Sequence, residues 1–123
     1  MSGDGKIQLY GIPNCDQVKK ARAWLDRHGF TYHFTDFKKA GVERQQLAAW
    51  QQQHPDGWEA LLNRKGTTWR GLPEERRAKV RDAASAAELM VELPSLIKRP
   101  VLVVGGNVSA GFSEAVFEKM LGA

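Results

Sequence analysis

The sequence predicts an α/β protein built on a mixed sheet, and three features of the chain support this class. A strand, a helix and a second strand open the chain, only helical patterns follow in the middle, and two strands and a helix close it. The chain has 123 residues, of which 42% are hydrophobic, so it can bury one sizeable core. We therefore expect a single domain over 1–123.

The opening elements follow from two changes of hydrophobic period. Residues 7–10 form a short β-prone run that ends at the turn signal of residues 11–14. Over 16–28, apolar residues recur every three or four positions, which predicts an amphipathic helix ended by Gly29. Residues 30–37 then alternate aromatic and polar side chains, as in a second strand. A β-α-β crossover makes the two strands parallel.

The middle of the chain, about 41–93, shows only helical patterns. We expect helices over 43–53, 58–63 and 73–82, and a further helix that Ser85 opens. Ser85 and Glu88 have the spacing of a capping box, in which the serine hydroxyl and the glutamate satisfy each other's backbone amides.

The last third of the chain predicts a hairpin followed by a helix. Residues 101–104 are a β-branched and aliphatic run, residues 105–107 form a turn, and Val108 begins the return strand. Ser113 caps a final helix, whose predicted buried residues are Val116, Phe117, Met120 and Leu121. The whole order, β-α-β then β-β-α, is the thioredoxin-like arrangement with an all-helical insertion at about 41–93.

Composition limits the functional classes. No apolar run reaches the roughly 18 residues of a membrane helix, and the start, residues 1–6, lacks the apolar run of a signal peptide. With one cysteine the chain closes no internal disulfide, so we expect a cytoplasmic protein without a membrane partner. The three histidines are isolated, so we expect neither a metal site nor a bound cofactor.

The net charge of +4 suits an anionic substrate and does not favour nucleic acid as a partner. Between Arg64 and Arg81 the chain carries seven basic and two acidic residues, a local charge of +5. This segment is either a solvated helix face or an anion-attracting wall beside a functional site.

Cys15 is the candidate nucleophile, because it lies where the first strand meets the first helix. Backbone amides and the helix dipole at a helix start stabilise a thiolate and lower its pKa. The alternative is a small buried filler without a role. A dithiol oxidoreductase has a second cysteine three residues on, where this chain has Val18. Any disulfide at Cys15 must therefore be resolved by another molecule, and glutathione is the abundant cytoplasmic thiol.

Three motifs, in order, resemble the ArsC-like family of arsenate reductases, Spx-type regulators and YffB-type proteins. They are GIPNC ending at Cys15, ALLNRK over 60–65 and LIKRPV over 96–101. The resemblance implies a thioredoxin-like core with a helical insertion, Cys15 as nucleophile, and Arg64 and Arg99 as basic residues facing it. Guanidinium groups hold thiolates, oxyanions and carboxylates by charge-assisted hydrogen bonds. The plainer alternatives are a cation at a helix C-terminus for Arg64 and a surface arginine for Arg99.

The resemblance also suggests substrate-binding residues: Asn14, Pro100, Phe112 and Ser113. In thioredoxin-like folds the proline corresponding to Pro100 is usually cis and presents backbone to a bound thiol peptide. Gly-Phe-Ser over 111–113 resembles YffB-type and Spx-type proteins, and faintly the glutaredoxin loop that holds a glutathione carboxylate. Ser113 as a helix cap alone needs no ligand. Arsenate reductases have a third arginine in this loop, and residues 108–114 contain none.

These observations give three hypotheses in order. The first is a glutathione-dependent thiol reductase of YffB type that uses one cysteine, with glutathione as co-substrate and an oxidised thiol or small oxyanion as substrate. The second is a Spx-like regulator that binds the RNA polymerase α subunit; Val18 removes the Cys-x-x-Cys redox switch typical of that group. The third is arsenate reduction.

Overall fold

The computed structural model describes residues 7–122, and within them the chain forms two compact units. The first comprises the residues up to Ala40 together with those from Arg99 onward, and the second is Gly41–Lys98. The insertion predicted at about 41–93 falls inside the second unit, which continues to Lys98. Residues 1–6, whose sequence lacks a signal-peptide pattern, lie outside the described residues. The single-domain expectation stays a prediction.

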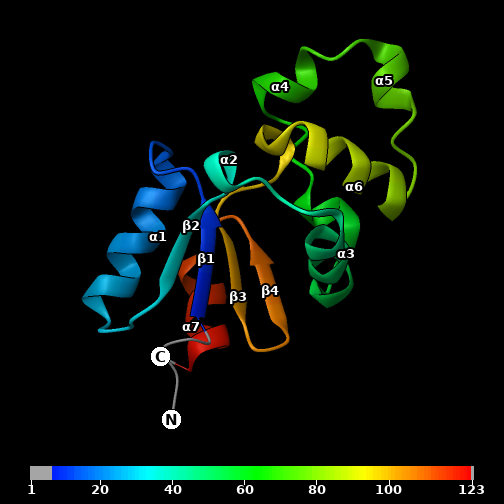
Figure 1. Ribbon diagram of the computed structural model, residues 1–123. Helices are drawn as coiled ribbons and strands as arrows, with labels where there is room; N and C mark the ends of the chain where they lie inside the picture. The colour runs from blue at the N-terminus through cyan, green and yellow to red at the C-terminus, as the bar shows by residue number, and fades with distance from the viewer. Residues whose placement is uncertain (1–6, 123) are drawn as a thin grey trace. The chain divides into compact units, whose positions relative to one another are not determined.

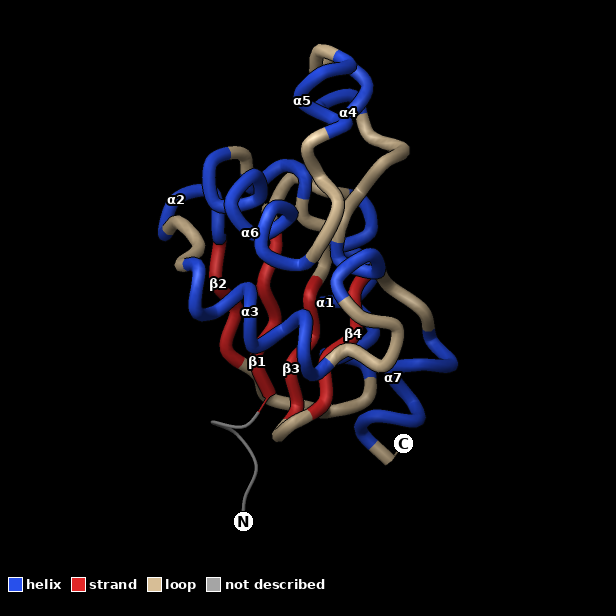
Figure 2. Tube along the Cα trace, turned by 90° about the vertical axis from the view of Figure 1, so that its right-hand side faces the viewer, coloured by secondary structure: helices blue, strands red, loops and turns tan. Residues whose placement is uncertain are grey.

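The first unit contains a four-stranded mixed sheet with strand order β2-β1-β3-β4 (Figures 1 and 2). Central strand β1 pairs with β2 in parallel and with β3 antiparallel, and β3 pairs antiparallel with β4. This confirms the α/β class and its thioredoxin-like arrangement. The strands are β1 (Ile7–Gly11), β2 (His33–Asp36), β3 (Val101–Val104) and β4 (Asn107–Ala110).

The second strand is shorter than the alternation over 30–37 predicted. The backbone N–H of Phe30 still bonds to the Leu25 carbonyl at 3.0 Å, so the end of the preceding helix holds this residue. At the other end, the Asp36 carboxylate accepts from the amides of Lys38 and Lys39, which begins the short helix α2 (Phe37–Ala40). Phe37 is therefore helical, and its ring is buried.

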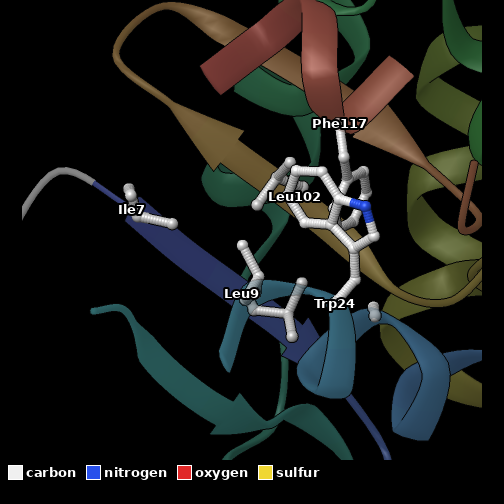
Figure 3. Packing of buried hydrophobic residues seen from close by; sticks show 7 residues of the cluster. Ile7, Leu9, Trp24, Leu102 and Phe117 are labelled. Atoms are coloured by element: carbon white, nitrogen blue, oxygen red, sulfur yellow. The ribbon is translucent and has the colours of Figure 1, made fainter. Parts of the chain in front are cut away.

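One apolar cluster attaches helices α1 (Asp16–Arg27) and α7 (Glu114–Leu121) to the sheet (Figure 3). Leu9 of β1 lies opposite Leu102 of β3, so both side chains share one face. The Trp24 indole from α1 lies against this face and meets Phe117 of α7 edge-on, with ring centroids 5.6 Å apart. The position of α1, and of whatever its first turn carries, therefore depends on this core.

Two predictions for the end of the chain need correction. Strand β4 begins at Asn107 rather than Val108, because Asn107 already pairs with Val104 across a turn in which Gly105 has φ +60°. Val116 is not buried, with 40% of the residue exposed, because Phe117 takes the inward position in the cluster. Ser113 caps α7 as predicted, since its hydroxyl accepts from the Val116 amide at 3.3 Å.

The second unit is helical, as predicted, but several of its helices are shorter than the sequence patterns suggested. The helix expected over 58–63 is a 3₁₀ turn that ends at Leu61, and the helix expected over 73–82 has only five residues. A further helix, Thr67–Arg70, was not predicted. Its elements are α3 (Arg44–Gln53), η2 (Trp58–Leu61), α4 (Thr67–Arg70), α5 (Glu74–Ala78), α6 (Ala83–Glu92) and η3 (Pro94–Leu96).

The predicted Ser85–Glu88 capping box is wrong, because the N-cap lies three residues earlier, at Asp82. Asp82 is the N-cap of α6: its carboxylate accepts from the Ser85 amide at 2.9 Å, and the Ser85 hydroxyl accepts from the Asp82 amide. Glu88 forms an exposed ion pair with Arg44 at 3.2 Å instead. The Ser85 amide and hydroxyl donate hydrogen bonds to the Asp82 carboxylate and so lower the pKa of Asp82.

None of the helices between residues 7 and 122 is both long and apolar enough to cross a lipid bilayer.

The corrected cap predicts unequal effects of two alanine substitutions on thermal stability. Asp82→Ala removes an acceptor for a backbone amide of α6 and should lower the melting temperature. Glu88→Ala removes only an exposed ion pair and should leave the melting temperature nearly unchanged. Circular dichroism melts of both variants test this, and a larger loss in Glu88→Ala would restore the cap first expected at Ser85.

Candidate functional site

Cys15 lies at the junction of β1 and α1, as the sequence predicts. A turn closed by the Cys15 amide and the Ile12 carbonyl, 3.2 Å apart, brings the chain out of the strand. Cys15 then adopts an extended conformation as the N-cap of α1, and its carbonyl accepts from the Lys19 amide at 2.9 Å. The residue is half-buried, so it is not an enclosed filler.

The surroundings of the Cys15 sulfur favour its charged form. Partial burial alone would raise the pKa of the thiol. The Val18 amide, the Arg99 guanidinium and the Gln17 amide are donors directed at the sulfur and lower the pKa instead, and the charge of Arg99 adds to their effect. The net result is a pKa below the ordinary value of a cysteine.

The two amides are those that an N-cap side chain normally reaches. With Cys15 as N-cap, Gln17 and Val18 are the second and third residues of the helix. The Cys15 side chain makes no capping hydrogen bond of standard geometry. The amide dipoles nonetheless stabilise negative charge on the sulfur. In the sequence, Val18 is notable only as the replacement for a second cysteine. Its place as the third helical residue after Cys15 is the signal that marks its amide as a donor to the sulfur.

Arg99 belongs to the same unit as Cys15 and precedes a cis peptide bond to Pro100. The cis bond agrees with the expectation drawn from the family resemblance. The Pro100 carbonyl accepts from the Gly111 amide at 2.9 Å, which connects the segment before β3 to the segment before α7. Pro100 is buried and Arg99 is half-buried. The effect of the Arg99 guanidinium on the pKa of Cys15 places Arg99 near the sulfur.

The other predicted substrate-binding residues of this unit flank these segments. Asn14 is exposed in the turn just before Cys15. Phe112 follows Gly111 and packs edge-on against Phe117, with ring centroids 5.0 Å apart. Ser113 is half-buried at the N-terminus of α7. Their roles toward a substrate stay predictions.

Arg64 belongs to the second unit and has partners there. Its guanidinium lies 3.5 Å from the Glu59 carboxylate and within 6 Å of two ring centroids, at 5.7 Å from Trp58 and 5.8 Å from Trp69. The side chain is 44% exposed, so the ion pair is solvated. A role for Arg64 at Cys15 stays a prediction.

Across residues 7–122, no group of three His, Cys, Asp or Glu side chains is placed to hold a metal ion.

The contact of Arg99 with the sulfur predicts a measurable change in the titration of Cys15. Arg99→Gln removes the positive charge and the guanidinium donor, so it should raise the pKa of Cys15. Arg27→Gln removes the same charge from the exposed last turn of α1 and is the matched control. Ultraviolet absorbance of the thiolate against pH measures both; equal midpoints in the two variants would contradict the assignment.

Comparison with known proteins agrees with the motifs. The ArsC family model matches residues 10–120. A solved YffB protein is 46% identical, covers 94% of this chain and 98% of its own, and has a TM-score of 0.87. An arsenate reductase-related protein from Brucella melitensis is 47% identical with full coverage of both chains and a TM-score of 0.73. The transcriptional regulator Spx of Streptococcus mutans is 25% identical over 88% of this chain and 77% of its own. Because the family model spans most of the sequence, the chain belongs to the ArsC family.

Proposed function

We propose that the protein is a glutathione-dependent thiol reductase that uses Cys15 as its only nucleophile. The observation that carries the proposal is the position of Cys15 at the start of α1, where two backbone amides and the Arg99 guanidinium lower the pKa of its thiol. A thiolate, not a thiol, attacks disulfide sulfur, so this environment increases the reactive fraction of Cys15 at neutral pH. Since Cys15 is the only cysteine of the chain, the second thiol must come from another molecule, and we assign this part to glutathione, the abundant cytoplasmic thiol.

The reaction proceeds through a mixed disulfide with balanced electrons. The Cys15 thiolate attacks the glutathione sulfur of a substrate–glutathione disulfide, forms a bond to it, and releases the substrate thiolate, which takes a proton from water. A second glutathione thiolate then attacks the glutathione sulfur bound to Cys15. Oxidised glutathione leaves, and the Cys15 thiolate is regenerated. The lowered pKa also makes Cys15 a better leaving group in this second step.

Glutathione carries two carboxylates, and the first unit offers donors for them. The Arg99 guanidinium can contact an anion as well as the sulfur, because it has five N–H donors. The Ser113 hydroxyl oxygen already accepts from the Val116 amide, so its hydrogen remains for donation to a carboxylate at the start of the eight-residue helix α7. We assign Asn14, Pro100 and Phe112 to the walls around the bound tripeptide.

A second candidate is a regulator that binds RNA polymerase, because the chain is similar to Spx over most of its length. Such a regulator would bind the α subunit without a dithiol switch, since residue 18 is valine. A pull-down with the purified α subunit distinguishes the candidates. Binding that survives Cys15→Ser favours the regulator, and no binding at micromolar protein dismisses it.

The reductase proposal predicts a specific adduct. After exposure to oxidised glutathione, intact-mass spectrometry should show one glutathione on the wild-type protein and none on Cys15→Ser. Reduced glutathione should then remove the adduct.

Catalysis is tested with a glutathionylated peptide as substrate, and arsenate is assayed in parallel. The protein should release peptide thiol in the presence of glutathione, and Cys15→Ser should not. Adduct formation without turnover of the peptide would overturn the proposal, and turnover of arsenate alone would replace it with arsenate reduction.

Arg64 is included in the proposal as a residue that supports the thiolate or the bound anion. Loss of a charge-assisted hydrogen bond of roughly 1.5–3 kcal/mol would lower kcat/KM about tenfold or more in Arg64→Ala. Arg76→Ala is the control, because Arg76 also has an exposed ion pair, with Glu92 at 2.8 Å. Equal, small effects in both variants would make Arg64 a surface residue of the second unit.

A further inference from the structure

Gly11, the last residue of β1, lies in a place where a side chain does not fit. It is buried and pairs in register with Asp36 of the neighbouring strand. It is absent from the glycines with positive φ among the described residues, so its backbone conformation does not require glycine. A Cβ at this position would instead lie 2.6 Å from Val18 Cγ2 and 3.4 Å from Val18 Cγ1. Residue 11 must therefore be glycine because there is no space for a Cβ beside Val18, not because of its backbone conformation.

Val18 cannot easily move out of this contact by itself. Its side chain is fully buried against the sheet, and valine in a helix has one strongly preferred rotamer. Both of its methyl groups lie within 3.5 Å of the position that a Cβ would take. Carbon atoms prefer separations of about 3.5–4.0 Å, so an added methyl group would push on the backbone of residue 18.

The first turn of α1 would yield rather than the strand. Gly11 ends the central strand β1, which pairs with β2 through Gly11 itself and with β3 through the preceding residues up to Tyr10. The first turn of a helix, in contrast, has amides without partners within the helix. Val18 is the third residue of α1, and its amide is one of the two that face the Cys15 sulfur. A displacement at Val18 therefore changes the distance between that amide and the sulfur.

We infer that Gly11 is a positioning residue for the nucleophile: by lacking a side chain, it lets Val18 pack against the end of β1 and so holds the Val18 amide at the Cys15 sulfur. The inference rests on the proposed function in that it treats Cys15 as the nucleophile. Gly11 has no polar side chain and contacts no substrate in the proposed reaction, so its role is to position the first turn of α1.

The test is a double-substitution cycle read by the titration of Cys15. Gly11→Ala should raise the pKa of Cys15 by about half a unit, which is about a threefold loss of thiolate well below the midpoint. Val18→Ala alone keeps the amide and removes both methyl groups, so its midpoint is the reference for the second half of the cycle. The combined variant, Gly11→Ala with Val18→Ala, should have the same pKa as Val18→Ala alone, because the methyl group of residue 11 then has space.

Leu25→Ala separates positioning from general destabilisation. Leu25 is fully buried later in α1, so its truncation should lower the melting temperature and leave the Cys15 midpoint unchanged. If Gly11→Ala does not fold, Val18→Ile enlarges the same contact by one methylene group and should raise the pKa in the same direction.

The inference is overturned if Gly11→Ala titrates as the wild type does, or if the combined variant titrates differently from Val18→Ala alone. Failure of the proposed function gives a different result. In that case the pKa changes follow the cycle, while the wild-type protein does not turn over the glutathionylated peptide.

Discussion

The chemistry of the first unit depends on stabilising one negative charge on a sulfur that is partly removed from water. Desolvation opposes ionisation of Cys15, and three donors outweigh it: two amides at the start of α1 and one guanidinium. The amides are available only because the helix begins at Asp16, immediately after Cys15. The guanidinium is available because Arg99 lies in the segment that leads into β3. The positions at which α1 and β3 begin therefore determine which donors surround the sulfur.

The core on one face of the sheet holds the start of α1 and the start of β3 in place. Trp24 and Phe117 fasten α1 and α7 against Leu9 and Leu102, so the helix that bears Cys15 and the strand that follows Arg99 share the same packing. The hydrogen bond from Gly111 to Pro100 connects the start of α7 to the same region.

The parts of the fold that local chemistry decides could be predicted from the sequence. The strand, turn and helix around Cys15 follow from a change of period at a Pro-Asn turn, and the Ser113 cap follows from its side chain. The predictions that were wrong concern segments in which two local structures compete. Asp82 and Ser85 both suit an N-cap, and Asp82 takes this position through its reciprocal hydrogen bonds with Ser85, while Glu88 pairs with Arg44. The alternation over 30–37 could not reveal that the Asp36 carboxylate would start a helix.

The site itself was predictable to a smaller degree. Position alone indicated Cys15, and the family resemblance indicated Arg99 and the cis bond to Pro100. The contact between Gly11 and Val18 leaves no pattern in a sequence, because it depends on how closely a helix approaches the end of a strand. Arg64 shows the reverse: a motif marks it, while the partners in the second unit are Glu59 and two tryptophan rings.

The most direct measurement of the central claim is the ionisation of Cys15 in the folded wild-type protein. Its thiolate absorbance should be titrated beside that of an unstructured peptide covering residues 12–19, which has the same neighbours in sequence but neither the fixed helix start nor Arg99. We expect a lower midpoint in the protein than in the peptide. A midpoint in the protein equal to or above that of the peptide would contradict it, because desolvation would then outweigh the three donors.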